Sequence, residues 1–363
     1  MTAPVGVPVS VRPHRPTDNG NGNGNGNAVG AVMPLDGPLV DRYGRVHSDL
    51  RISVTDRCNL RCTYCMPEEG MTFLHRDDLL TFDEISRVAK VAWNLGITAL
   101  RLTGGEPLVR QGLPSLIERL AEIGFEDLAM TTNGTGLARS AQRLARAGLR
   151  RVNVSCDSLQ PERFATIRRR GILAVVLDAM TAAEAAGLTP LKVNVVLRHG
   201  QNDDEVLDFA SFARTTGRIV RFIEFMPLDA QGEWDRAQLV PGSEVFERIS
   251  AVWPLEPLSD PTGAAPAERF RFADGRGEIG LISSVTQPFC GTCNRLRLTA
   301  EGSLRNCLFS DDELSVRRVL RDGGSDSDVA LMFREAVWAK FPGHGINEPG
   351  FLRPARSMSM IGG

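Results

Sequence analysis

The sequence of 363 residues has only three lysines and two tyrosines, and it has almost no excess of charge of either sign. The formal net charge of -2 excludes the broad basic surface typical of nucleic-acid-binding domains and of domains that bind anionic membranes. We therefore expect neither partner. Any basic binding site must be local, and arginine must supply most of its charge.

Long apolar runs are also missing. No run reaches the roughly 18 apolar residues of a membrane span, and the first residues lack the apolar centre of a secretory signal. These absences predict a cytoplasmic location. No lysine follows a glycine, so the chain has no P-loop for a nucleotide. In a reducing compartment, seven cysteines indicate metal or redox chemistry and not a disulfide framework.

The chain divides by composition into four parts. Residues 1–35 contain the Gly/Asn alternation NGNGNGNGN and have too little apolar surface for a core, which predicts a disordered tail. Residues 36–226 are predicted to form an α/β domain, and 227–340 a smaller C-terminal region. Residues 341–363 form a tail that ends in Gly-Gly.

Six short β-rich runs alternate with helical stretches in the larger part. This pattern predicts six βα units in an incomplete TIM-like barrel, with the active site at the carboxyl ends of its strands. Thr81 and Glu84 form a capping box that starts the first helix. The runs cover residues 51–55, 98–103, 127–132, 151–156, 191–197 and 219–225. Beyond them, 269–273 and 278–285 are expected to be antiparallel strands.

The first cysteine group follows the first predicted strand directly. Cys58, Cys62 and Cys65 have the spacing CNLRCTYC, which supplies three soft thiolate ligands on a short loop. A [4Fe-4S] cube held by three thiolates keeps one iron open for another ligand. The spacing also fits one face of a helix, but the neighbouring residues are polar. Structural zinc requires four ligands, and no fourth Cys or His lies nearby.

The second cysteine group lies near the end of the chain. Cys290, Cys293 and Cys307 again supply three thiolates, which favours a second [4Fe-4S] cluster with one open iron over a zinc site completed by a distant histidine. Cys156, in a predicted strand, is interpreted as a small buried residue.

Cationic residues lie on predicted strand ends or beside the second cysteine group. Guanidinium groups suit phosphate oxygens, although ordinary surface ion pairs are the alternative for each residue taken singly. The sequence RRR at 168–170 is interpreted as a solvated helix face. The candidate phosphate-binding residues are Arg51, Arg101, Lys192, Arg221, Arg295 and Arg297.

The motif CNLRCTYC resembles the CxxxCxxC motif of the radical S-adenosylmethionine (SAM) superfamily, and TGGEP (103–107) resembles its SAM-binding motif. More narrowly, VNVSCDSL, VRFIEFMPL, CGTCNRLRLTAEGSLRNCLF and the terminal MSMIGG resemble the GTP 3′,8-cyclases of molybdenum cofactor biosynthesis. That resemblance runs from about residue 38 to 363. It implies reductive cleavage of SAM to a 5′-deoxyadenosyl radical, which abstracts hydrogen from C3′ of GTP. The product is (8S)-3′,8-cyclo-7,8-dihydroguanosine 5′-triphosphate, formed by a lyase.

The resemblance also implies roles for single residues. The first cysteine group would hold the cluster that cleaves SAM, and the second group a cluster that binds guanine. Arg295 and Arg297 would serve catalysis as well as substrate binding. SAM would contact Tyr64, Gly105, Ser155 and Met226. GTP would contact Arg51, Arg101, Thr131, Lys192, Arg221, Arg295, Arg297, Gly362 and Gly363.

The resemblance further implies partners: GTP, an electron donor, and a cyclic pyranopterin monophosphate synthase that takes the product. We expect a monomer or a homodimer. Two alternatives remain open at this point. One is a radical SAM enzyme that modifies a peptide, and the other is a non-catalytic zinc protein.

Overall fold

The computed structural model describes residues 32–69, 71–260 and 263–362. Most of the predicted N-terminal tail, residues 1–31, and the terminal Gly363 lie outside the described residues. Among the helices that are described, none combines the length and apolarity needed to cross a membrane.

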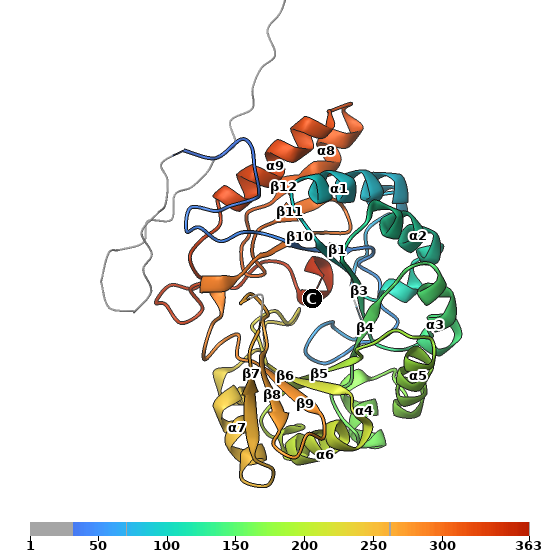
Figure 1. The fold of residues 1–363 in the computed structure, drawn as a ribbon, viewed down its shortest axis with the longest axis vertical. Coiled ribbons are helices and arrows are strands. Elements are labelled where there is room, and N and C mark those ends of the chain that lie inside the picture. The colour runs from blue at the N-terminus through green and yellow to red at the C-terminus, as the bar shows by residue number, and fades with distance from the viewer. Residues whose placement is uncertain (1–31, 70, 261–262, 363) are drawn as a thin grey trace, which may run out of the picture.

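Six parallel strands and the helices that connect them form the first part of the fold, as predicted. The strands occupy consecutive places in one curved sheet, and helices cover its outer side (Figure 1). The strands are β1 (Asp49–Ser53), β2 (Ala99–Thr103), β3 (Asp127–Thr132), β4 (Arg151–Ser155), β5 (Lys192–Leu197) and β6 (Ile219–Glu224), and the helices are α1 (Phe82–Asn94), α2 (Leu113–Ile123), α3 (Leu137–Arg146), α4 (Pro161–Arg168), α5 (Leu173–Ala185) and α6 (Val206–Thr216).

The C-terminal region continues the same sheet on both sides. Strand β9 (Glu278–Ile282) pairs parallel with β6, and β10 (Arg295–Leu298) pairs parallel with β1, so the parallel part extends beyond the six predicted strands. Strands β8 (Glu268–Phe272) and β9 pair antiparallel, as predicted. The remaining elements are α7 (Gly242–Ser250), β7 (Leu255–Leu258), β11 (Ser303–Arg305), β12 (Leu314–Ser315), α8 (Val316–Arg321), α9 (Asp326–Trp338) and α10 (Met358–Ile361).

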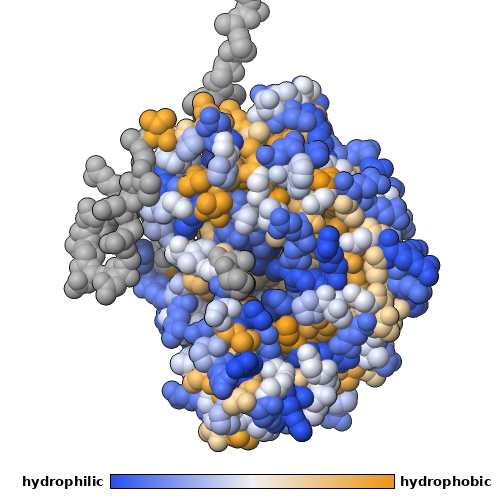
Figure 2. All heavy atoms as spheres, in the orientation of Figure 1, coloured by the Kyte–Doolittle hydropathy of each residue, from blue (hydrophilic) through white to orange (hydrophobic). Residues whose placement is uncertain are grey.

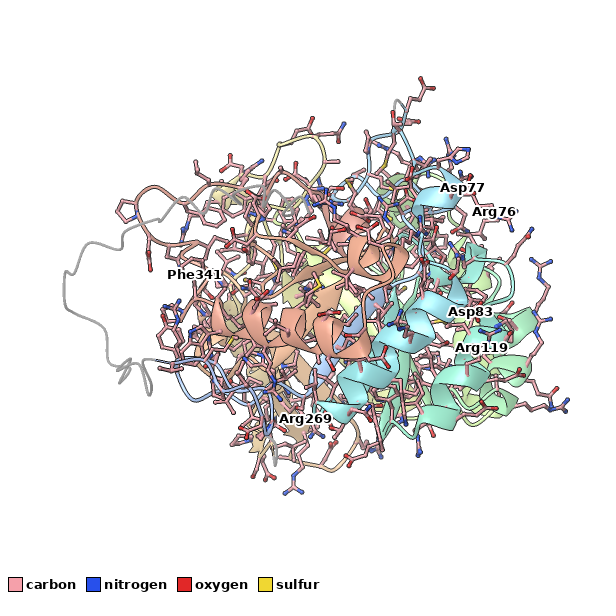
Figure 3. All side chains as sticks on the ribbon, turned by 90° about the horizontal axis from the view of Figure 1, so that it is seen from above. Arg76, Asp77, Asp83, Arg119, Arg269 and Phe341 are labelled. Atoms are coloured by element: carbon pink, nitrogen blue, oxygen red, sulfur yellow. The ribbon has the colours of Figure 1, made fainter. Side chains whose placement is uncertain are left out.

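Helix α1 shows how local sequence fixes these elements. The hydroxyl of Thr81 accepts a hydrogen bond from Glu84 N, and the Glu84 carboxylate accepts one from Thr81 N, which confirms the capping box. One such cap contributes about 1 kcal/mol. The inner face of α1 is buried against the sheet, while its outer side carries Asp83, which pairs with Arg119 of α2 (Figure 3). The helices on the right of Figure 2 accordingly present many hydrophilic side chains.

The interior of the barrel receives the C-terminal end of the chain. Short helix α10 lies at the centre of the curved sheet, far from α9 in the view of Figure 1. The loops that follow the parallel strands therefore surround the tail. This arrangement places the two cysteine groups, which are more than two hundred residues apart in sequence, around one interior space.

Candidate active site

The first cysteine group lies on an irregular loop after β1 and not on a helix, so the helix-face alternative is wrong. A turn brings Cys62 and Cys65 together, because Cys65 N and Met66 N both donate to Cys62 O, at 3.0 and 3.1 Å. The Sγ atom of Cys58 accepts from Leu60 N at 3.4 Å and from the Asn133 side chain at 3.7 Å. Burial raises the pKa of Cys58 to about 11 and also raises the pKa of Cys65. Thiolates in this pocket therefore need a bound cation.

The two glycines of TGGEP hold that loop against β2. Gly105 N donates to Thr55 O at 2.8 Å, and Glu106 N donates to Arg57 O at the same distance. An added Cβ on Gly104 would overlap Thr55 O, and one on Gly105 would lie 2.6 Å from the carbonyl carbon of Arg57. Glycine is thus required so that the two loops can touch.

The interpretation of residues 168–170 as a solvated helix face is wrong for Arg168, although Arg170 is exposed. Arg168 is only 3% exposed, and its guanidinium contacts Cys62 Sγ at 3.3 Å and Asp157 at 2.7 Å. The Tyr64 hydroxyl also donates to Asp157, at 2.8 Å. Burial alone lowers the pKa of Arg168, but Asp157 and Cys62 outweigh burial and keep it well above its ordinary value. A charged guanidinium therefore lies against one thiol of the first group, at the end of α4.

Glu106 is a second site residue that the sequence analysis did not predict, although it belongs to the motif TGGEP. Its carboxylate is 1% exposed and accepts from Asn133 N at 2.6 Å, from Leu108 N at 3.0 Å and from the Thr132 hydroxyl at 2.8 Å. Burial raises the pKa of Glu106 to about 7. Its position in the motif TGGEP was the signal that could have identified it.

In the second cysteine group, Cys290 and Cys293 lie between β9 and β10, and Cys307 follows β11. Cys307 Sγ accepts from Phe309 N at 3.5 Å, and Cys293 Sγ accepts from Lys340 Nζ at 3.4 Å. Burial raises the pKa of Cys290 to about 11. Burial also acts to raise the pKa of Cys293, but Arg295 and Lys340 lower it to about 6. The two groups thus share one arrangement: three thiols that are buried or half-buried, one of which contacts a buried cation.

Both cysteine groups line one interior cavity of about 290 Å³. Most of the predicted site residues contribute to its wall. They come from strands β1, β2, β3, β4, β6 and β10 and from the loops after β1, β2, β6, β9 and β11. Arg51, Cys58, Cys62, Tyr64, Cys65, Arg101, Gly105, Thr131, Ser155, Arg221, Met226, Cys290, Cys293, Arg295, Arg297 and Cys307 all line it.

A row of arginines crosses the wall between the two groups. In the parallel register, Arg297 of β10 is paired with Arg51 of β1, and Arg51 is paired with Arg101 of β2. The prediction that Arg51, Arg101 and Arg221 lie at strand ends is wrong, because all three lie inside their strands. Burial, reinforced by neighbouring arginines, lowers the pKa of Arg297 to about 10 and that of Arg221 to about 9. Buried like charges of this kind are stabilised by an anion.

Several donors in this row have no partner. In the part of the chain that the structure describes, Arg51 Nε, Arg101 Nε and Arg295 Nη1 are buried without a hydrogen bond. An unsatisfied buried donor is costly, so these atoms indicate a polyanionic ligand. Arg221, in contrast, donates to the Asn194 side chain, at 2.6 and 2.9 Å.

Lys192 is not on the cavity wall. It begins β5, on the same strand face as Asn194, and so lies at the amino end of the barrel below the cavity. Burial, together with Arg221, Arg151 and Arg101, lowers the pKa of Lys192 to about 7. It can reach only the part of a ligand that extends to this deeper end.

The C-terminal tail touches the arginine row. Arg297 donates to Gly362 O, and an added Cβ on Gly362 would overlap the Thr103 hydroxyl and lie 2.9 Å from the Ser53 hydroxyl. The prediction for Gly363 falls outside the described residues. Cys156 follows β4 immediately, instead of lying inside it, and is fully buried as predicted, with its thiol directed to Ser158 O.

The cysteines are not arranged around a single metal ion. Within residues 32–69, 71–260 and 263–362, no group of three or more His, Cys, Asp or Glu side chains has that geometry. A cube of four irons takes its thiolates on separate irons, and each group of three thiols on the cavity wall supplies a ligand set of that kind.

Two sequence families match the chain. The Radical SAM superfamily matches residues 52–213, and Molybdenum Cofactor Synthesis C matches residues 218–346. Among curated relatives, a GTP 3′,8-cyclase of Mycobacterium sp. (strain KMS) is 45% identical over 99% of both chains. A GTP 3′,8-cyclase of Streptomyces coelicolor is 48% identical over 90% of this chain and 96% of that protein.

Solved structures support the same fold. Native anSMEcpe with bound AdoMet has a TM-score of 0.54 and 16% identity, with 82% of each chain covered. Streptococcus suis SuiB bound to S-adenosylmethionine has a TM-score of 0.56 and 11% identity, over 78% of this chain and 65% of SuiB. The motifs, the fold and the near full-length identity agree, and the chain belongs to the GTP 3′,8-cyclase family of the radical SAM superfamily.

Proposed function

We propose that this protein is a GTP 3′,8-cyclase, a lyase that uses SAM and two [4Fe-4S] clusters to convert GTP to (8S)-3′,8-cyclo-7,8-dihydroguanosine 5′-triphosphate. The observation that carries the proposal is that two cysteine triads and a row of arginines line the same cavity. Family membership supports the reaction. The alternative of a peptide-modifying enzyme is disfavoured, because a peptide does not require a buried row of arginines.

Each part of the cavity has a role in this proposal. Cys58, Cys62 and Cys65 would hold the cluster that binds SAM, and Cys290, Cys293 and Cys307 would hold the second. When bound, the first cluster and SAM would supply a 5′-deoxyadenosyl radical to remove hydrogen from C3′ of GTP. Tyr64, Gly105, Ser155 and Met226 would contact SAM.

The arginine row would orient GTP between the two triads. Arg51, Arg101 and Arg295 have buried donors that remain free for phosphate or guanine oxygens. Thr131, Arg221 and Arg297 share the same wall, and Lys192 would reach the ligand from below. Cations fixed in this way would bind the triphosphate with little reorganisation and so hold GTP in one orientation.

The tail completes the enclosure. The carbonyl oxygen of Gly362 accepts a hydrogen bond from Arg297. We propose that Gly362 and Gly363 exclude water from the reacting ribose. We further propose a cytoplasmic monomer or homodimer that takes electrons from a reducing donor. Its product would pass to a cyclic pyranopterin monophosphate synthase.

The test is an anaerobic assay of the reconstituted, reduced protein with SAM and GTP. Mass spectrometry should detect both 5′-deoxyadenosine and the cyclised nucleotide, and iron and sulfide should each approach about eight per chain. The Cys65→Ala variant should lose 5′-deoxyadenosine formation. Normal 5′-deoxyadenosine production in that variant would contradict the assignment of the first triad, and one or two zinc ions in place of iron would favour a non-catalytic zinc protein.

A further inference from the structure

Lys340 is a buried cation to which the proposed reaction assigns no role. It lies just after α9, is 3% exposed, and is one of only three lysines in the chain. Its ammonium donates to Arg295 O at 2.8 Å and to Cys293 Sγ at 3.4 Å. A buried ammonium group is costly unless it is paired, so its partners identify its purpose.

The surroundings of Lys340 hold it against the second triad. Arg45 donates to Phe341 O and to Cys290 O, both at 2.7 Å, and so ties the segment after Lys340 to the triad loop. Phe341 lies beyond the end of α9 in Figure 3. From the other side, the Asn306 amide donates to Ala336 O of α9 at 3.0 Å. The ammonium is therefore fixed and not a mobile surface group.

The charge balance differs between the two triads. At the first triad, Arg168 contacts Cys62 but is paired with the carboxylate of Asp157 at 2.7 Å. At the second triad, the charged groups that act on Lys340 are the Cys293 and Cys307 thiols and the cations of Arg45 and Arg295. Arg45 is balanced by the buried carboxylate of Asp41, which leaves the charges of Lys340 and Arg295 beside the thiols. Within the described residues, no carboxylate forms an ion pair with Lys340. The second triad is thus the more electropositive of the two.

We propose that Lys340 is a positioning residue that neutralises the Cys293 thiolate and raises the reduction potential of the cluster that the second triad holds. The inference rests on the proposed function only in taking that group to be an iron-sulfur cluster. Hydrogen bonds to cluster sulfurs and nearby positive charge stabilise the reduced, more negative form. The second cluster consequently accepts an electron at a higher potential than the first, whose cation is balanced by Asp157.

The experiment is an anaerobic potentiometric titration of the reconstituted full-length protein, followed by electron paramagnetic resonance. Signals are assigned with the Cys65→Ala variant, which lacks one ligand of the first triad. Lys340→Met removes the charge at similar side-chain length, and Lys340→Arg keeps it. Lys90→Met is the matched control, because Lys90 lies outside the cavity, over the ring of Trp93.

We expect Lys340→Met to lower the midpoint potential of the second cluster and to leave that of the first unchanged. Lys340→Arg should stay closer to the unsubstituted protein, and Lys90→Met should match it. Loss of the second cluster in Lys340→Met but not in Lys340→Arg would also support the proposal, because it would show that the cluster needs a cation at position 340. Equal potentials in Lys340→Met and the unsubstituted protein, equal shifts of both clusters, or cluster loss in both variants would overturn the proposal. Cyclisation of GTP is scored separately, so the proposed function can fail without affecting this result.

Discussion

Replacing Arg168 by methionine should destabilise the protein strongly, because it leaves a buried carboxylate without its cation. Arg168 and Asp157 are 3% and 1% exposed, and their charged groups are 2.7 Å apart. Removing one partner of a buried ion pair costs about 3–5 kcal/mol. Asp157 keeps hydrogen bonds from the Tyr64 hydroxyl and from Val196 N, so we expect the lower end of this range, about 3 kcal/mol.

The assay is urea unfolding of the cluster-free protein under anaerobic, reducing conditions. Arg271→Met is the control, because Arg271 and Glu256 form an ion pair in which both side chains are about half exposed. Such a surface pair contributes at most about 1 kcal/mol. A double-mutant cycle with Asp157→Asn should return a coupling energy of about 2 kcal/mol between positions 168 and 157.

The reasoning has two points at which it can fail. If Arg168→Met costs no more than Arg271→Met, Arg168 is not a buried partner of Asp157. If the coupling energy is below about 0.5 kcal/mol, the cost of the substitution comes from packing and not from charge. In either case, the contact between Arg168 and Cys62 would also lose its electrostatic interpretation.

Two further predictions concern the substrate end of the cavity. In Gly362→Ala the added Cβ would overlap the Thr103 hydroxyl, and we expect about a tenfold or greater loss of GTP cyclisation. The control is Gly323→Ala, at a position with a similar positive φ but no atom near the added Cβ, and it should keep full activity. A variant of Gly362 with normal turnover would contradict a role for the tail. The pKa of Lys192 is lowered to about 7, so the side chain is mostly neutral at pH 8. The triphosphate favours the charged form, so GTP binding should take up close to one proton at pH 8 and should weaken as the pH rises above 7. Calorimetry in two buffers of different ionisation enthalpy measures this uptake, which Lys192→Met should abolish; an uptake that persists in that variant would assign the proton to another group.

Local pattern was sufficient for the first six βα units and for both cysteine triads. Each strand run and each capping residue involves neighbours within a few positions, and thiolate spacing on a short loop is a local property. The sequence also indicated that arginine would supply the anion site, because so little lysine is present. Its description of those arginines as strand-end residues was wrong, because side chains at alternate positions inside a parallel strand also point into a barrel.

The sequence by itself determined the six βα units and identified the cysteines and most of the arginines that line the cavity. Only the tertiary structure decided that β9 and β10 continue the parallel sheet on opposite sides, which brings the second triad to the mouth of the barrel. It also decided which cation contacts each triad, since Arg168 is 106 positions from Cys62 and Lys340 is 47 positions from Cys293. Periodicity and spacing encode contacts between near neighbours, whereas contacts at such separations depend on how whole elements pack around a common core.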